Sequence, residues 1–216
     1  MRSQFATVVL LAAIGGSMYA AEKTRVDVYI NDRDDSSQLL GPGKVLAAGI
    51  FDQIGVRLVW HNGELPAATN AGRTDASTPV FAVRTSEHAL ETATSGALAS
   101  ARIVGSSGTE ITIYKDRLQR FLANHASAAN VAAGYVLAHE LAHVMQGVAR
   151  HSESGIMKAH WAPEDCQAMV FHKLAFTQLD VELIHRGLAV ERASRRSEPV
   201  VVAESVSPAV FNLAEK

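Results

Sequence analysis

The sequence contains a single cysteine, Cys166, among its 216 residues. An intramolecular disulfide framework and any metal site built from several cysteines are therefore excluded. Cationic residues are not in excess either, since 20 Lys and Arg stand against 22 Asp and Glu for a formal net charge of −2. Without a basic surplus to neutralise phosphates, nucleic-acid binding is disfavoured. Cys166 itself is expected to be a small buried hydrophobic residue rather than a nucleophile.

Long hydrophobic runs are confined to the first twenty residues. Arg2 supplies a positive charge, residues 5–14 are apolar, and small residues follow up to Ala20 and Ala21. This pattern predicts a secretory signal peptide over residues 1–20, because the apolar run is shorter than the ~20 residues that a spanning helix needs. An uncleaved membrane anchor is the alternative. We expect an exported chain, secreted or periplasmic, with no stable membrane insertion of its mature part.

Aromatic residues make up only 6% of the chain, but hydrophobic residues make up 48%, which is enough to build a folded core. Up to Tyr114, short segments alternate apolar and polar residues and predict strands. One helix is expected among them, over residues 44–54, closed by Gly55. The predicted strands cover residues 26–30, 56–60, 80–84, 97–104 and 110–114.

After residue 116 the pattern becomes helical. Residues 117–124 and the Ala-rich, proline-free residues 128–147 predict two helices. A further helix is expected to begin at Pro163, because proline is tolerated in a first turn, and to end near Gly187. The sequence therefore predicts one α+β domain over residues 24–187 with a small mixed β-sheet. Residues 188–216 are expected to form a flexible C-terminal tail.

Histidine is the abundant functional residue, with nine in the chain, and the informative segment runs over residues 137–161. His139 and His143 are four residues apart in a predicted helix, so both imidazoles lie on one face and can bind one cation. Glu140 lies about 100° round the helix, where it can hold a metal-bound water without being a ligand. A stripe on the opposite side is expected to pack into the core: Leu137, Leu141, Val144 and Val148.

A catalytic zinc with two histidine ligands needs a third ligand and an open position for water. Gly147 can end the helix in a left-handed conformation, so that the chain turns back and brings His151 beneath the first two histidines. A turn that ends in Met157 follows, which favours His151 as the third ligand. Other donors near this turn stay open as alternatives: Glu164, Asp165 and His160.

The order His139-Glu140-x-x-His143, then Gly147, His151 and Met157, resembles the zinc signature of the metzincin metallopeptidases. The family spacing is HExxHxxGxxH, whereas this chain reads HExxHxxxGxxxH. The resemblance is therefore to a divergent, small, metzincin-like group. It implies a zincin-like fold with an N-terminal-subdomain helix, a long active-site helix and a C-terminal helix. It also implies that His151 completes the zinc site and that Met157 forms a hydrophobic floor beneath it.

The expected reaction is hydrolysis of a peptide bond by a zinc-activated water with Glu140 as general base. The resemblance implies that an edge strand, either residues 97–104 or residues 110–114, binds the substrate backbone. Tyr114 and His160 are candidates for assisting the oxyanion. Two other functions stay open: an exported zinc-binding protein without catalysis, and a zinc amidase acting on a non-peptide cell-wall amide.

The remaining aromatic and histidine residues are expected to be structural. Trp161 is expected to pack behind the turn. Five histidines have no partner at ligand spacing and are expected on the surface or in the core: His61, His88, His125, His172 and His185.

Overall fold

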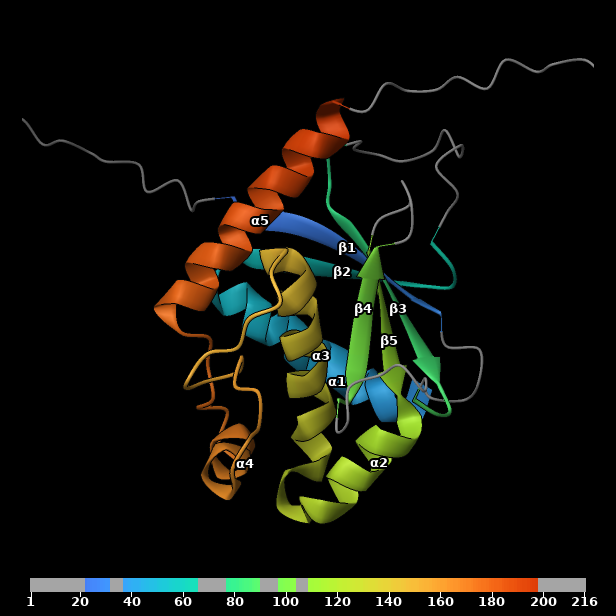
Figure 1. Ribbon diagram of the computed structural model, residues 1–216, viewed down its shortest axis with the longest axis vertical. Coiled ribbons are helices and arrows are strands. Elements are labelled where there is room, and N and C mark those ends of the chain that lie inside the picture. The colour runs from blue at the N-terminus through green and yellow to red at the C-terminus, as the bar shows by residue number, and fades with distance from the viewer. Residues whose placement is uncertain (1–21, 32–36, 66–76, 90–96, 104–108, 198–216) are drawn as a thin grey trace, which may run out of the picture.

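The computed structural model describes residues 22–31, 37–65, 77–89, 97–103 and 109–197. Within these ranges the chain forms five strands and five α-helices in a mixed α+β arrangement (Figure 1). This confirms the α+β class predicted from the sequence. The predicted signal peptide and residues 198–216 lie outside the described ranges. None of the described helices combines the length and the hydrophobicity needed to cross a bilayer.

The strands form one mixed sheet in the order β2-β1-β3-β5-β4. Parallel pairs join β1 to β2, β1 to β3 and β3 to β5, whereas β4 runs antiparallel to β5. Of the two strands considered as the substrate-binding edge, β4 lies at an edge and β5 is internal. The strand bounds are Thr24–Asn31 for β1, Val56–Asn62 for β2, Val80–Ser86 for β3, Ala99–Ile103 for β4 and Thr109–Tyr114 for β5.

The first crossover connection, α1 (Ser37–Gln53), joins the parallel strands β1 and β2 and packs against α3 (Ala129–Gln146). The predicted start of this helix at Lys44 is wrong, because the helix begins at Ser37 and includes Pro42. Proline removes one backbone donor there. The helix still forms because an apolar face on both sides of the proline is buried in the core: Leu40, Ala47, Ile50 and Phe51.

The helices after β5 are α2 (Lys115–Asn124), α3, α4 (Pro163–Val170) and α5 (Gln178–Ser197). The single helix predicted from Pro163 to Gly187 is wrong. The chain breaks between α4 and α5, where His172 has a positive φ of 54°. Gly187 does not end a helix either, since α5 continues to Ser197, past the predicted start of the tail. A Cβ at Gly187 would overlap the carbonyl oxygen of Met145, so this glycine lets α5 cross α3 closely.

Helix α3 runs through the middle of the molecule, between β4 and the C-terminal helices (Figure 1). The predicted stripe is half right: Leu137 and Leu141 are buried, Val144 is partly buried, and Val148 lies beyond the helix and is 44% exposed. Burial extends well beyond one stripe, because α1 and α5 cover other faces of the helix. Its further buried residues are Ala132, Ala133, Tyr135, Val136, Ala138, Ala142 and Met145. Side chains on α3 are therefore held on a scaffold that is packed on several sides.

Candidate metal centre

Two histidines project from α3 one helical turn apart. His139 is buried and His143 is half-buried. Their rings meet edge to face with centroids 4.6 Å apart, and the two Nε2 atoms are 3.0 Å apart. The four-residue spacing predicted from the sequence therefore places two imidazole nitrogens at one point beside the helix.

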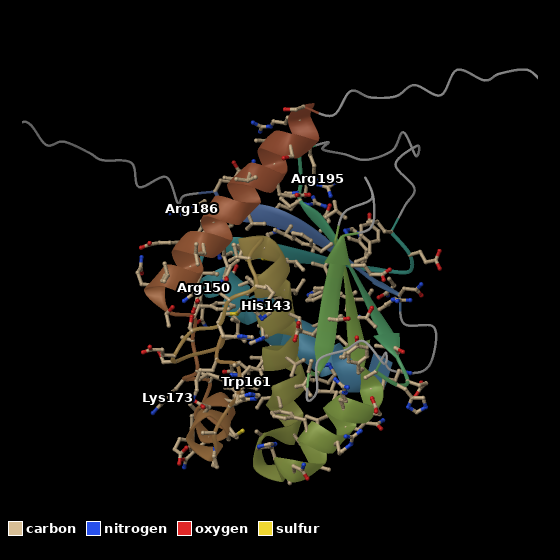
Figure 2. All side chains as sticks on the ribbon, in the orientation of Figure 1. His143, Arg150, Trp161, Lys173, Arg186 and Arg195 are labelled. Carbon is tan, nitrogen blue, oxygen red and sulfur yellow. The ribbon has the colours of Figure 1, made fainter. Side chains whose placement is uncertain are left out.

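His151 approaches this point from the segment after α3. The helix ends at Gly147, whose φ of 66° is left-handed as predicted and whose N–H donates to the carbonyl of His143. The His151 ring centroid then lies 4.9 Å from that of His143 and 5.4 Å from that of His139. Figure 2 shows His143 on α3, with Arg150 and Trp161 on the chain that follows it.

The three histidines can hold one metal ion, since a ligand atom from each lies within 4.8 Å of the other two. Two nitrogens bound to one zinc at about 2.0–2.1 Å in a tetrahedral arrangement would be about 3.3 Å apart. The Nε2 atoms of His139 and His143 are already near that separation. A small rotation of these rings would suffice for a shared cation.

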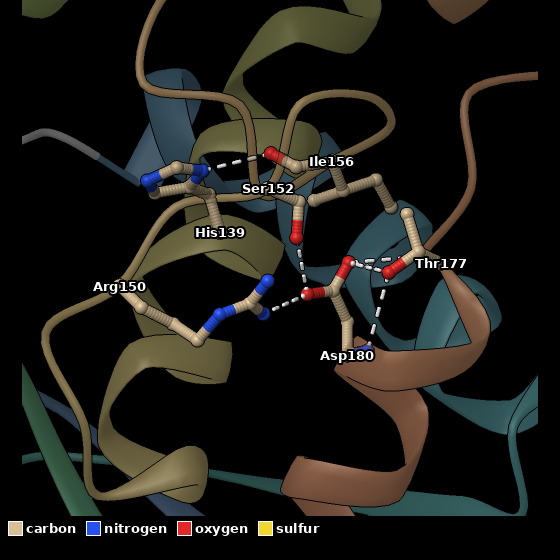
Figure 3. Close-up of polar contacts among 6 residues, drawn as sticks. All are labelled: His139, Arg150, Ser152, Ile156, Thr177 and Asp180. Atoms are coloured by element: carbon tan, nitrogen blue, oxygen red, sulfur yellow. Dashed lines mark hydrogen bonds and ion pairs between the residues drawn. The ribbon is translucent and has the colours of Figure 1, made fainter.

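A backbone carbonyl fixes the tautomer of His139. The Nδ1 atom of His139 lies 2.8 Å from the carbonyl oxygen of Ile156 (Figure 3). A carbonyl oxygen only accepts, so Nδ1 carries the hydrogen and donates it. The Nε2 atom of His139 then carries a lone pair, which can accept a hydrogen bond from Nε2 of His143 at 3.0 Å or bind a metal ion in its place. Metal-binding histidines commonly use their second nitrogen in this way.

The turn that carries Ile156 is itself tightly anchored. Gly155 has a φ of +77°, and a Cβ on it would overlap the carbonyl oxygen of Ala175, to which the N–H of Ile156 donates at 2.9 Å. Met157 is fully buried, and its carbonyl accepts from the N–H of Ser152 at 2.7 Å. The turn predicted over residues 154–157 is therefore present, and its backbone touches the segment around His151.

Burial controls the ionisation of the site. It lowers the pKa of His139, and together with the charges of His139 and His151 it lowers the pKa of His143 to about 4. Both helix-borne imidazoles are therefore neutral at pH 7, the form that binds metals. Burial also raises the pKa of Glu140, the residue after His139, to about 7. The residue that follows His139 in the sequence therefore carries a carboxyl group that gains and loses a proton near neutral pH.

The other donors considered for the third ligand lie outside this cluster in the described part of the chain. Asp165 accepts from the N–H of Ala162 at 2.8 Å and pairs with Lys158, so it caps the first turn of α4. Glu164 and His160 have exposed side chains. Among these alternatives the geometry favours His151.

Three other residues with a predicted role are held in place by packing or hydrogen bonds. Trp161 packs edge to face on His139 at 5.5 Å and also contacts Phe121, which agrees with a packing role. Tyr114 is buried, and its hydroxyl forms a 2.7 Å hydrogen bond with that of Ser100. Cys166 is 3% exposed, and burial raises the pKa of its thiol, as expected of a residue that is not a nucleophile.

The five other histidines lie outside the three-histidine group. His61 stacks on Tyr29, and His125 and His185 bond the carbonyls of Phe121 and Ile54. Those carbonyl contacts tie both rings to helix ends. His88 and His172 have exposed side chains.

The sequence interpretation missed Asp180, a fully buried carboxylate on α5. It accepts from Arg150 and Ser152, on either side of His151, and from Thr177 (Figure 3). Burial alone would raise its pKa, but the hydrogen bonds from Ser152, Thr177 and Arg150 lower the pKa overall. The sequence pattern that could have identified Asp180 is Thr177-x-x-Asp180, a capping-box pattern that marks the start of a helix.

No known family model matches this chain, and no curated protein matches its sequence. The metal centre therefore has to be argued from the chain's own residues. These residues bring together three imidazoles, with a fixed tautomer on one of them, and the residue after His139 carries a carboxyl group with a raised pKa.

Proposed function

We propose that the protein is an exported zinc-dependent metallopeptidase that hydrolyses peptide bonds with Glu140 as general base. The observation that supports this most is that His139, His143 and His151 each bring a ligand atom within 4.8 Å of the other two. Glu140 directly follows the first of these histidines in the sequence. A protein that only sequesters a metal has no need for a carboxyl group directly after the first ligand. Export rests on the leader pattern of residues 1–20.

The donor set fits zinc. Neutral imidazole suits zinc among other transition metals, and three histidines with an open fourth position form a common catalytic zinc site. Bound there, zinc would lower the pKa of a water molecule and polarise a carbonyl group. The fixed Nδ1–H of His139 orients one ligand for this role in advance.

Glu140 supplies proton transfer in this proposal. Its carboxylate takes a proton from the attacking water and returns it to the amine that leaves when the peptide bond breaks. A raised pKa of about 7 suits a group that must accept and release a proton near neutral pH. Because Glu140 sits on a helix that is packed on several sides, its backbone position is fixed relative to His139 and His143.

The edge strand β4 is the proposed docking place for the substrate backbone. It is the antiparallel edge of the sheet and contacts α3, which carries the site. An extended peptide can pair with the outer N–H and C=O groups of such a strand. Together with the helix-borne HExxH and the buried Met157 turn, this arrangement supports a zincin-like, metzincin-related fold.

Glu140→Gln tests the proposal. The substitution keeps size and polarity but removes the base, so kcat on casein or a peptide library should fall by about 10²–10⁴-fold while zinc content stays at the wild-type level. Zinc content by metal analysis and the Tm serve as controls for folding. Near wild-type turnover by Glu140→Gln in zinc would contradict the role of this residue.

The two other functions give different results in the same assays. A metal-binding protein without catalysis would bind zinc but cleave no peptide, with or without a chelator. A cell-wall amidase would leave peptides intact and release products from a peptidoglycan digest, which mass spectrometry identifies. Chelator-sensitive peptide cleavage is the outcome that we expect.

A further inference from the structure

The third histidine lies in a different environment from the first two. Its side chain is exposed and comes from a segment without regular secondary structure, after the end of α3. The two residues that flank it, however, both donate hydrogen bonds to the same buried oxygen atom. Arg150 Nη1 donates to Asp180 Oδ1 at 2.8 Å, and Ser152 Oγ donates to the same oxygen at 2.6 Å (Figure 3).

The two oxygens of Asp180 have separate partners. Oδ2 accepts from the N–H of Thr177 at 3.0 Å and from its hydroxyl at 2.7 Å, while the Asp180 N–H donates to that hydroxyl at 3.2 Å. This reciprocal pair caps the N-terminus of α5. Oδ1 is therefore the atom that faces the segment around His151. Helix capping accounts for one oxygen and leaves the other unexplained.

We propose that Asp180 is a positioning residue for the metal centre, which holds the backbone at His151 by binding both of its neighbours through Oδ1. The inference rests on the proposed function, because it assumes that His151 is a ligand. A flexible segment loses conformational entropy when its side chain binds a metal. A segment already tied to a buried carboxylate on α5 loses less, so the metal binds more tightly.

A second anchor restrains the same segment. The N–H of Ser152 donates to the carbonyl of Met157, and the carbonyl of Ile156 in the same turn accepts from His139. Ser152 is thus held through its backbone by the turn and through its hydroxyl by Asp180. The turn and α5 together connect the loop histidine to the histidine on α3.

The first experiment distinguishes the roles of the two Asp180 oxygens. It measures the Zn²⁺ affinity of variants in competition with a chromophoric chelator. Asp180→Asn and Ser152→Ala should each weaken zinc binding by about tenfold, at the lower end of the range for groups that orient a ligand. Thr177→Val is the matched control: it breaks the capping side, and it should lower the Tm while leaving zinc affinity at the wild-type value. Unchanged affinity in Ser152→Ala, or equal weakening in Thr177→Val, would overturn the proposal.

The second experiment asks whether Asp180 acts through His151. In a His151→Ala background, Asp180→Asn should weaken zinc binding no further, because the ligand that it positions is gone. With Co²⁺ in place of zinc, the visible absorption of Asp180→Asn should shift toward that of His151→Ala. A further tenfold loss in the double variant would show that Asp180 stabilises the fold in general and would contradict its positioning role.

These measurements use the metal alone, so they stand apart from catalysis. If wild-type protein binds zinc but cleaves no peptide, the proposed peptidase activity is wrong and the role of Asp180 is still decided by the variants. If wild-type protein binds neither Zn²⁺ nor Co²⁺, both proposals are overturned.

Discussion

The two halves of the candidate metal centre are built in opposite ways. His139 and His143 stand on α3, a helix buried against α1 and α5, and their separation follows from one helical turn. His151 is exposed and stands on an irregular segment, and its neighbours are tied to Asp180 on α5. One half is positioned by local geometry and the other by contacts that are distant in sequence.

This difference separates what each half contributes. The helix supplies a pair of nitrogens that is in place before any ion arrives, with one tautomer fixed by Ile156. His151 completes the group from an exposed segment. A site assembled in this way should bind metal through both halves, whereas its folding stability should depend mainly on the buried half.

Removing one ligand from each half gives the largest expected effect. His139→Ala and His151→Ala should both weaken zinc binding by more than ~100-fold, since even groups that only orient a ligand are worth 10–100-fold. In metal-free protein they should differ: His139→Ala should cost about 1–3 kcal/mol because the buried carbonyl of Ile156 loses its donor. His151→Ala should stay within about 0.5 kcal/mol.

Urea unfolding in EDTA and zinc competition measure the two quantities on the same samples. His172→Ala, at an exposed histidine outside the cluster, is the control and should change neither. Equal destabilisation by His139→Ala and His151→Ala in EDTA would remove the distinction between a rigid and a tethered half.

The same contrast explains what the sequence could reveal about the site. That His139 and His143 lie together was predictable because helical spacing is a local rule that needs no knowledge of the rest of the fold. The third member of the histidine group was one of four candidates in the sequence, because a loop residue is placed by tertiary contacts. The segment around His151 is bound by Asp180, which is 28 residues from Ser152 in the sequence. The sequence favoured His151 but left Asp165 open as an alternative, because the capping contacts of Asp165 are visible only in the fold.

The fold too was predicted well where local rules decide the structure and poorly where distant contacts decide it. The five strands and the helices α2 and α3 were predicted within a few residues. Two positions, Pro42 and Gly187, were misleading, although Gly147 and Pro163 lie at helix ends as predicted. The first helix was predicted to begin only after Pro42 and the last to end near Gly187, but Pro42 lies inside α1 and Gly187 lies at a close crossing of α5 over α3. A residue that ends a helix and a residue that lets two helices touch look the same in a sequence, because the difference lies in the neighbouring helix.

The turn that joins the two halves offers the next largest effect. Gly155 and Gly147 both have positive φ, but a Cβ on Gly155 would overlap the carbonyl of Ala175, while a Cβ on Gly147 meets nothing within 4 Å. Gly155→Ala should therefore cost at least about 2 kcal/mol of folding stability. Gly147→Ala should cost only about 1 kcal/mol, from left-handed strain alone.

Urea unfolding of the two glycine variants measures this difference. Zinc affinity adds a second measurement, since a displaced Gly155 moves the carbonyl of Ile156 that orients His139. Gly155→Ala should therefore also weaken zinc binding, by about tenfold. An equal loss of folding stability in the two variants would mean that the turn moves to accommodate the Cβ atom. Its contact with Ala175 would then not fix the position of the turn.

The half of the site on α3 should also affect how the folding stability of the metal-free protein changes with pH. This is the smallest effect that we expect. Burial raises the pKa of Glu140 from 4.5 to about 7, so the folded chain binds a proton that the unfolded chain releases, and stability falls as pH rises through this window. Burial lowers the pKa of His143 from 6.5 to about 4. The unfolded chain then binds the extra proton, and stability rises with pH over that window.

Glu140 and His143 change the folding stability in opposite directions as pH rises. Replacing one of them should therefore leave the pH dependence that is due to the other. In EDTA, between about pH 4.5 and about pH 6.5, unfolding free energies should rise with pH for Glu140→Gln and fall with pH for His143→Gln, relative to wild type. Each change should be on the order of 1 kcal/mol, since both groups are partly exposed and solvent screens them. Urea unfolding at several pH values measures the slopes. Parallel profiles for both variants and wild type would mean that the helix-borne groups titrate as they do in the unfolded chain, and burial would then not distinguish the helix half of the site from the loop half.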